Sequence, residues 1–108
     1  LNNAINIANL EQKIADLPNG VNTVVGNDGV KLSGGERQRI ALARAIYREP
    51  SIFFMDESTS ALDTKTEEII INNIKYKFKD KTMIIIAHRK STIEMCDKVL
   101  NLKDGSLI

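Results

Sequence analysis

The sequence has few of the residues that build disulfide frameworks, metal clusters or aromatic binding faces. Its 108 residues include one cysteine, one histidine and no tryptophan, and only 5% are aromatic. A single cysteine cannot form an intramolecular disulfide, which suits a reducing compartment. It also provides no Cys/His pair at the spacing of a zinc site. Disulfide-stabilised and zinc-stabilised modules are therefore excluded.

A strong net charge and long apolar runs are also missing. Fifteen basic residues against fourteen acidic ones give a formal charge of +1, so charge alone would not hold nucleic acid or an anionic membrane. The longest apolar run, residues 83–87, is far shorter than the ~20 residues that cross a bilayer, and so is the run at residues 69–71. We therefore expect no nucleic-acid partner, and a membrane role only through another protein.

What is present is the composition of one globular unit, with 43% hydrophobic and 27% charged residues. The first residue is Leu1, which suggests a piece of a longer protein. Apolar residues at helical spacing predict a helix over residues 4–17, closed by Pro18. Residues 21–29 are predicted to form an irregular loop.

Two capping patterns predict the longer helices. Ser33 with Glu36 three residues later is a capping box, and the helix that it begins should end at Pro50. Thr64 with Glu67 repeats the pattern and predicts a second helix.

Residues 51–55, apolar after Ser51, and residues 82–86, apolar after Thr82, are typical of strands covered on both faces. With the helix over residues 64–78 between them, they predict a βαβ unit and a parallel sheet. A short helix from Ser91 and a hairpin over residues 99–108 complete the expected α/β fold.

Polar residues follow both predicted strands. Asp56 and Glu57 end the first, and His88 follows the second. Ligands of parallel sheets bind beyond the carboxyl ends of the strands. Two adjacent carboxylates there could hold a hydrated Mg²⁺ and deprotonate a water. Taken alone, the carboxylates could equally be a solvated strand end, and His88 a structural histidine.

A serine and two glycines stand at the entrance of the first capped helix. Free N–H groups and the positive end of the helix dipole make such an entrance an anion site, and glycines let a phosphate approach the backbone. For Ser33, Gly34 and Gly35 alone, an ordinary N-cap is the simpler interpretation.

The order of these motifs strongly resembles the C-terminal half of an ATP-binding cassette (ABC) ATPase. The matches are residues 32–36 with the family's signature motif, residues 52–57 with the Walker B strand and catalytic glutamate, residues 60–63 with the D-loop, and His88 with the switch histidine. The resemblance implies a P-loop NTPase-like (RecA-like) parallel sheet core. Residues 51–108 would belong to that core, and residues 1–50 to the helical subdomain.

A finer resemblance is to the exporter branch of the family. Residues 17–20 and 23–29 resemble the exporter-specific X-loop, whose usual form is TEVGERG. This sequence departs from it at Val24, Asn27 and Asp28. In the family, that loop contacts the coupling helices of the transmembrane domain.

The family's P-loop, G-x-x-x-x-G-K-[ST], does not occur in the sequence. Gly29 and Gly34 have its internal spacing, but Gly35 follows in place of lysine. We therefore expect the isolated chain to be inactive.

The resemblance divides the predicted site residues between two composite sites. On the nucleotide of the same subunit, Asp56 would hold Mg²⁺ through water, Glu57 would activate the attacking water and His88 would contact the γ-phosphate. The residues that would contact the ATP of a partner subunit are Ser33, Gly34, Gly35 and Glu36. Asp63 would link the two sites.

The function implied is that of an ABC exporter's nucleotide-binding domain, which couples ATP hydrolysis to transport at the cytoplasmic face of the cell membrane. Its partners would be a second ATP-binding domain and a transmembrane domain. Two alternatives are an ABC-type ATPase of DNA repair or chromosome maintenance, and a non-catalytic binding fragment.

Overall fold

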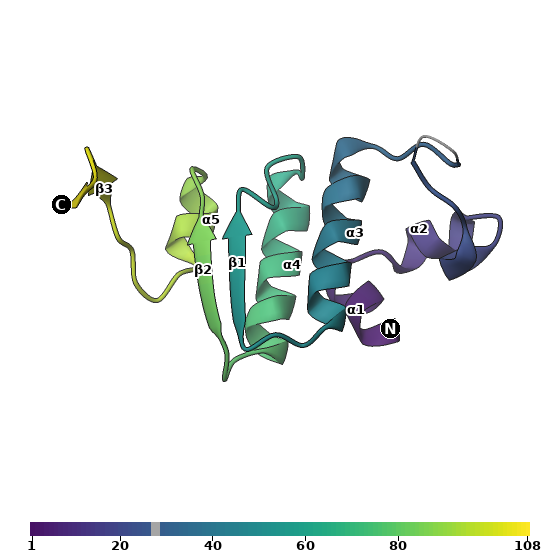
Figure 1. The fold of residues 1–108 in the computed structure, drawn as a ribbon, viewed down its shortest axis with the longest axis horizontal. Coiled ribbons are helices and arrows are strands. Elements are labelled where there is room, and N and C mark those ends of the chain that lie inside the picture. The colour runs from purple at the N-terminus through teal and green to yellow at the C-terminus, as the bar shows by residue number, and fades with distance from the viewer. Residues whose placement is uncertain (27–28) are drawn as a thin grey trace.

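The computed structural model describes residues 1–26 and 29–108 (Figure 1). Its elements follow in the order α1 (Asn2–Ile7), α2 (Glu11–Asp16), the 3-10 turn η1 (Gly20–Asn22), α3 (Gly34–Tyr47), β1 (Ile52–Asp56), α4 (Thr64–Lys77), β2 (Thr82–Ile86), α5 (Lys90–Glu94), β3 (Leu102–Lys103) and β4 (Ser106–Leu107). Within these residues no helix has both the length and the apolar character needed to span a bilayer.

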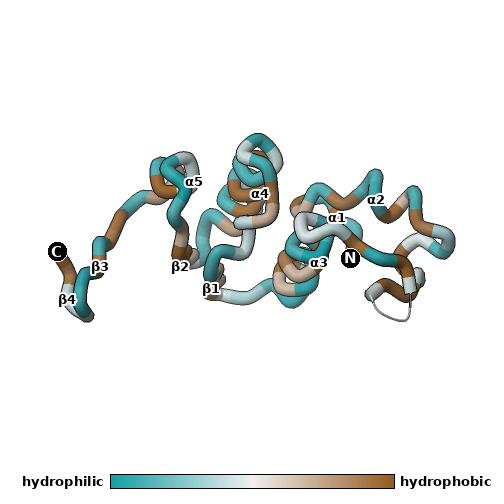
Figure 2. Tube along the Cα trace, turned by 90° about the horizontal axis from the view of Figure 1, so that it is seen from above, coloured by the Kyte–Doolittle hydropathy of each residue, from teal (hydrophilic) through white to brown (hydrophobic). Residues whose placement is uncertain are grey.

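The two strands β1 and β2 pair in parallel, from Ile52 opposite Thr82 to Asp56 opposite Ile86. Helix α4 connects them, so the predicted βαβ unit is confirmed. Figure 2 shows that α4 and α5 lie on the same side of the two strands. The described residues thus form two layers, with helices on one face of the sheet.

The covered face of the sheet carries the main core. Phe53 of β1 is 5% exposed, and its ring centroid lies 4.9 Å from that of Phe78 at the end of α4. Further buried apolar side chains complete this cluster: Ala4, Ile7, Leu42, Ile46, Met55, Leu62, Ile70 and Ile74. Helices α1, α3 and α4 and strand β1 are therefore packed around one core.

The opposite face of the sheet is apolar but open. Its residues on β1 are Ile52 and Phe54, and those on β2 are Ile84 and Ile86; all four are exposed, Phe54 at 74%. No element of the described chain lies on that side (Figure 2). The prediction that both faces of the strands are covered is wrong for the described residues, because their helices pack on one face of the sheet only.

The single helix predicted over residues 4–17 is also wrong. The structure has two short helices, α1 and α2, separated at Asn9, whose φ is 57°. Asparagine tolerates this left-handed conformation better than most residues. The break directs the Asn9 carbonyl to the guanidinium of Arg39 (2.8 Å) and buries Leu10. Tertiary contacts thus interrupt a helical sequence pattern.

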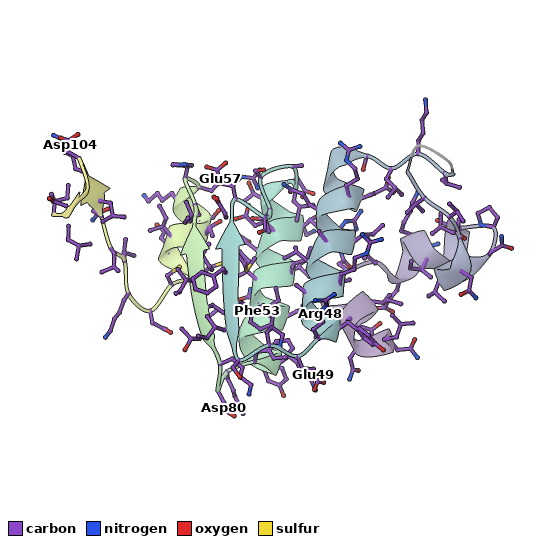
Figure 3. The ribbon with its side chains drawn as sticks, in the orientation of Figure 1. Arg48, Glu49, Phe53, Glu57, Asp80 and Asp104 are labelled. Carbon is purple, nitrogen blue, oxygen red and sulfur yellow. The ribbon has the colours of Figure 1, made fainter. Side chains whose placement is uncertain are left out.

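Helix α3 has the predicted cap. Ser33 is its N-cap residue and forms a full capping box with Glu36. The helix ends at Tyr47, close to Arg48 and Glu49 in Figure 3, and Glu49 takes a φ of 47°. The residue before Pro50 is disfavoured in the helical region, which is why the helix stops there.

The caps predicted for α4 and α5 are wrong. Asp63, not Thr64, is the N-cap of α4, and its carboxylate accepts a hydrogen bond from the Thr66 amide (3.2 Å). Glu67 is instead drawn into the interior by an ion pair. Helix α5 begins at Lys90, one residue before Ser91.

The predicted C-terminal hairpin is present, with strands of two residues each. Asp104 and Gly105 form its turn with φ angles of 51° and 79°, as a two-residue hairpin turn requires. The hairpin stands apart from the helices and the parallel sheet (Figure 1). The radius of gyration is accordingly 15.0 Å, against about 13 Å for a compact chain of this length.

Candidate functional site

The carboxyl ends of β1 and β2 bring Glu57 and His88 together. The Glu57 amide donates to the carbonyl of Ile86 at the end of β2 (2.9 Å). The His88 Nε2 lies 2.7 Å from the Glu57 Oε1. Both side chains are open to solvent, His88 at 81% and Glu57 at 46%. Figure 3 shows Glu57 just beyond the end of β1.

The backbone of Glu57 is strained. Its φ is 51°, in the left-handed region that costs a non-glycine residue on the order of 1–3 kcal/mol. Such a conformation persists only where the surroundings hold it. Here the Ile86 carbonyl holds the Glu57 amide, and the Gln38 side chain donates to the Glu57 carbonyl (3.3 Å).

Gln38 of α3 also binds the loop that follows Glu57. Its Nε2 donates to the Ser60 Oγ (2.9 Å), and its Oε1 accepts from the Ala61 amide (2.8 Å). Sequence reasoning missed this residue. The available signal was its position one helical turn after Gly34, on the face of α3 that meets the loop.

The residues of the signature motif at the start of α3 are tied together by the capping box. The Ser33 amide donates to the Glu36 Oε1 (2.8 Å), and the Ser33 Oγ accepts from the Glu36 amide (3.2 Å). The Lys13 ammonium lies 2.9 Å from the other Glu36 oxygen. The hydrogen bond from the Ser33 amide, followed by that from Lys13, lowers the pKa of Glu36 from its ordinary 4.5 to about 2.

A groove of about 380 Å³ runs between the start of α3 and the loop before α4. It is lined by Ser33, Gly34, Gly35, Arg39, Ala61, Leu62, Asp63 and Thr66. The structure thus places most of the signature residues and Asp63 in one groove. Asp56, Glu57 and His88 are not part of its lining.

The two glycines of the signature allow this loop to approach α3 closely. A Cβ added to Gly35 would lie 3.2 Å from the Leu62 Cδ2 and 3.3 Å from the Ala61 carbonyl oxygen. At Gly34 the nearest atom, the Ala61 Cβ, would be at 3.4 Å. The sequence pattern explained these glycines by the approach of a phosphate, and the structure adds a packing reason for Gly35.

Asp63 acts as a helix cap in this conformation. Its carboxylate accepts the hydrogen bond from Thr66 that begins α4, and the Thr66 side chain and amide lower the pKa of Asp63. Its role as a link between two sites stays a prediction.

An ion pair joins the segment after β2 to α4, and a hydrogen bond joins that segment to the same loop. Glu67, whose side chain is 2% exposed, pairs with the Arg89 guanidinium. The second Arg89 nitrogen donates to the Ser60 carbonyl (2.9 Å). Sequence reasoning assigned Glu67 to a cap and did not single out Arg89, because 22 residues separate the two partners.

Asp56, at the end of β1, is the residue predicted to contact Mg²⁺. In the described ranges, no three His, Cys, Asp or Glu side chains are grouped as metal ligands. Mg²⁺ in phosphoryl-transfer sites usually keeps several waters and is held by one or two carboxylates plus the substrate phosphates. The exposed carboxylate of Asp56, at the end of β1, fits that kind of contact.

Comparison with known proteins decides the family. The sequence model of the ABC transporter family matches residues 5–60, about half of the chain. This chain belongs to the ABC transporter family.

Curated relatives of this ABC transporter chain are much longer. The ATP-dependent lipid A-core flippase of Pseudoalteromonas translucida (strain TAC 125) is 50% identical over 94% of this chain, which spans 17% of the flippase. The multidrug resistance protein pgp-1 of Caenorhabditis elegans is 49% identical over 97% of this chain, which spans 8% of that protein.

A solved structure extends the likeness to the fold. A bacterial Atm1-family ABC exporter with ATP bound superimposes with a TM-score of 0.87 and 46% identity, over 96% of this chain and 18% of the exporter chain. The resemblance to the ABC transporter family is therefore confirmed, and the chain has part of the ABC ATPase domain fold.

Proposed function

We propose that the chain is the C-terminal part of the nucleotide-binding domain of an ABC exporter. Residues 1–50 would belong to its helical subdomain and residues 51–108 to its ATPase core. The relatives named as a flippase and a multidrug resistance protein favour an exporter over the DNA-associated ATPases. The open apolar face of β1 and β2 supports a core that is shared with a further layer.

The observation that carries the proposal is the contact between Glu57 and His88 beyond the parallel strands. A Glu57 carboxylate at this edge can accept the proton of an attacking water. His88, 2.7 Å away, would orient that carboxylate and contact the γ-phosphate. A Mg²⁺ held through water at Asp56 would neutralise charge on the phosphates of ATP. This pairing favours a catalytic role over a non-catalytic binding fragment.

The start of α3 would serve the nucleotide of a second ATP-binding domain. The Ser33 Oγ accepts one hydrogen bond within the capping box and keeps its own hydrogen to donate to a phosphate. The amides of Gly34 and Gly35 add the positive end of the helix dipole. Glu36 would hold Ser33 in place, and Asp63, in the same groove, would link the two sites.

The remaining partners follow from the same proposal. A transmembrane domain would contact the X-loop-like segment, of which Asn27 and Asp28 lie outside the described residues. The ATPase would then stand at the cytoplasmic face of the membrane. Without a P-loop in its sequence, the chain by itself would be inactive.

The test is Glu57→Gln in the complete ATPase that contains this chain. The amide keeps the size of the side chain but cannot accept a proton, so turnover should fall by ~10²–10⁴ while ATP binding persists. Phosphate release and nucleotide binding are measured in parallel. Glu68→Gln, at an exposed position of α4, is the matched control and should leave both unchanged. Near-normal turnover in Glu57→Gln would exclude Glu57 as the base.

A further inference from the structure

One side chain of α3 holds the loop that carries Glu57. The Gln38 amide makes three hydrogen bonds there, to the Glu57 carbonyl, the Ser60 Oγ and the Ala61 amide. Because a carbonyl can only accept and a backbone amide can only donate, these bonds determine which way the Gln38 amide faces. We infer that Gln38 is a positioning residue that sets the orientation of Glu57 from the signature helix.

The backbone geometry of Glu57 explains why its loop needs a hydrogen-bonding partner such as Gln38. Its left-handed backbone (φ 51°) directs the side chain away from the course of β1 and toward His88. On one side of the residue, β2 holds the Glu57 amide through the Ile86 carbonyl. On the other side, the Glu57 carbonyl accepts two hydrogen bonds, one from the Ser60 amide within the same turn (3.1 Å) and one from Gln38 (3.3 Å). Gln38 also holds Ser60 and Ala61, so its loss would leave this turn with only its own Ser60 bond. The peptide after Glu57 would then be freer to rotate and to carry the carboxylate away from His88.

Glutamine is chemically specific for this position. Its amide presents a donor and an acceptor at the end of a three-carbon stem, and all three bonds use that end. Glutamate of the same length keeps the acceptor for the Ala61 amide but loses the donor to the Glu57 carbonyl. Methionine keeps the length and loses both.

Gln38 also connects the signature residues at the start of α3 with the loop that carries Glu57. Gln38 lies one turn from Gly34 in the same helix, so a displacement of the signature residues moves the Gln38 amide with them. This inference rests on the proposed function, in which Ser33, Gly34 and Gly35 face a partner's nucleotide and Glu57 faces the chain's own. Closure of the first site would then be transmitted to the base of the second.

The test compares Gln38→Met and Gln38→Glu in the complete ATPase. Both should lower kcat by on the order of 10-fold to 100-fold, the penalty for a small displacement of a catalytic group. The KM for ATP should change little, because the lost contact acts on the transition state rather than on nucleotide binding. Gln12→Met is the matched control: Gln12 donates a hydrogen bond to the exposed Asp16 of α2, away from the loop of Glu57, and the kcat of this variant should stay at the wild-type value.

A second measurement separates positioning from a general structural role. Single-turnover hydrolysis with enzyme in excess is measured for Gln38→Met in the Glu57→Gln background. If Gln38 acts through Glu57, its replacement should have almost no further effect there. A loss of the same factor in both backgrounds would overturn the inference.

The remaining outcomes are equally decisive. Wild-type kcat in either Gln38 variant would overturn the inference, as would a rise in KM equal to the loss in kcat/KM. Should Gln38→Met fail to fold, Gln38→Glu, which retains the bond to Ala61, carries the test. If Glu57→Gln itself keeps normal turnover, the proposed function fails; if only the Gln38 variants keep it, the proposed function stands and this inference fails.

Discussion

Both faces of the β1–β2 sheet carry large apolar side chains, but one face is covered and the other is exposed. On the helical side, Phe53 and Met55 are buried against α4 and its neighbours. On the other side, Ile52 and Phe54 of the same strand are exposed. Apolar character alone therefore does not tell which face of this sheet is stabilised.

The difference shows where the stability of the chain resides. Burial of apolar area contributes only where another layer removes the side chains from water. Helices α3 and α4 do so on one side. On the same side, the polar contacts of Gln38 and Arg89 fix the loop that bears the candidate site. The covered face of the sheet therefore provides both the packed core and the contacts that fix the loop of the candidate site.

The most direct way to break the comparison is to truncate one phenylalanine on each face. Phe53→Ala should lower the free energy of unfolding by ~3–5 kcal/mol, because it leaves a cavity against Phe78. In the 108-residue chain by itself, Phe54→Ala should change it by no more than ~0.5 kcal/mol, because the side chain is 74% exposed there. Urea unfolding followed by circular dichroism measures both. Equal losses would mean that the open face is covered in solution.

A smaller loss of stability is expected from a substitution at Gly35, where the loop before α4 packs closely against α3. Gly35→Ala should destabilise by ~1–3 kcal/mol, because its methyl would press on Leu62 and on the Ala61 carbonyl. Gly34→Ala, one residue earlier, meets only an ordinary contact and should be neutral or stabilising by up to ~1 kcal/mol. Thermal unfolding of the two variants compares them. The same loss in both would show that helix entry, not loop approach, requires glycine.

The smallest effect concerns the charged cap at the start of α3. The folded pKa of Glu36, about 2, lies below its ordinary value of 4.5, so its stabilisation is present above pH 4.5 and is lost as the pH falls toward 2. Glu36→Gln should therefore be less stable than the wild type near neutral pH, by at most ~1 kcal/mol, and the difference should vanish toward pH 2.

Thermal unfolding across that pH range measures the effect. Lys13→Met is a graded control, because it removes the second cause of the low pKa of Glu36 and leaves the hydrogen bond from Ser33. It should narrow the pH dependence without abolishing it. A Glu36→Gln variant that differs from the wild type by the same amount at every pH would contradict the assigned cause.

Local patterns in the sequence predicted much of the fold. The strands β1 and β2, the capped helix α3 and the terminal hairpin all follow from short-range signals, because caps, turns and apolar runs act within a few residues. The helix over residues 4–17 failed because its interruption at Asn9 is made by Arg39, thirty residues away. The cap of α4 failed because Asp63 competes with Thr64 for the same role.

In the candidate site, too, some residues could be predicted from local patterns and others could not. Asp56, Glu57 and His88 could be predicted because parallel strands bring their carboxyl ends to one edge. Gln38 and Arg89 could not, because they bind the loop of residues 57–61 from 19 to 29 positions away. No local pattern encodes such a distant partner.

The sequence by itself determined the order of the motifs, the family resemblance and the residues at the strand ends, since each depends on neighbouring residues or on fixed spacing. Only the tertiary structure decided which face of the sheet is covered, why Gly35 must lack a side chain and how Glu57 is held in a strained backbone. Those properties arise from contacts between segments, and packing, hydrogen-bond geometry and burial exist only once the segments are brought together.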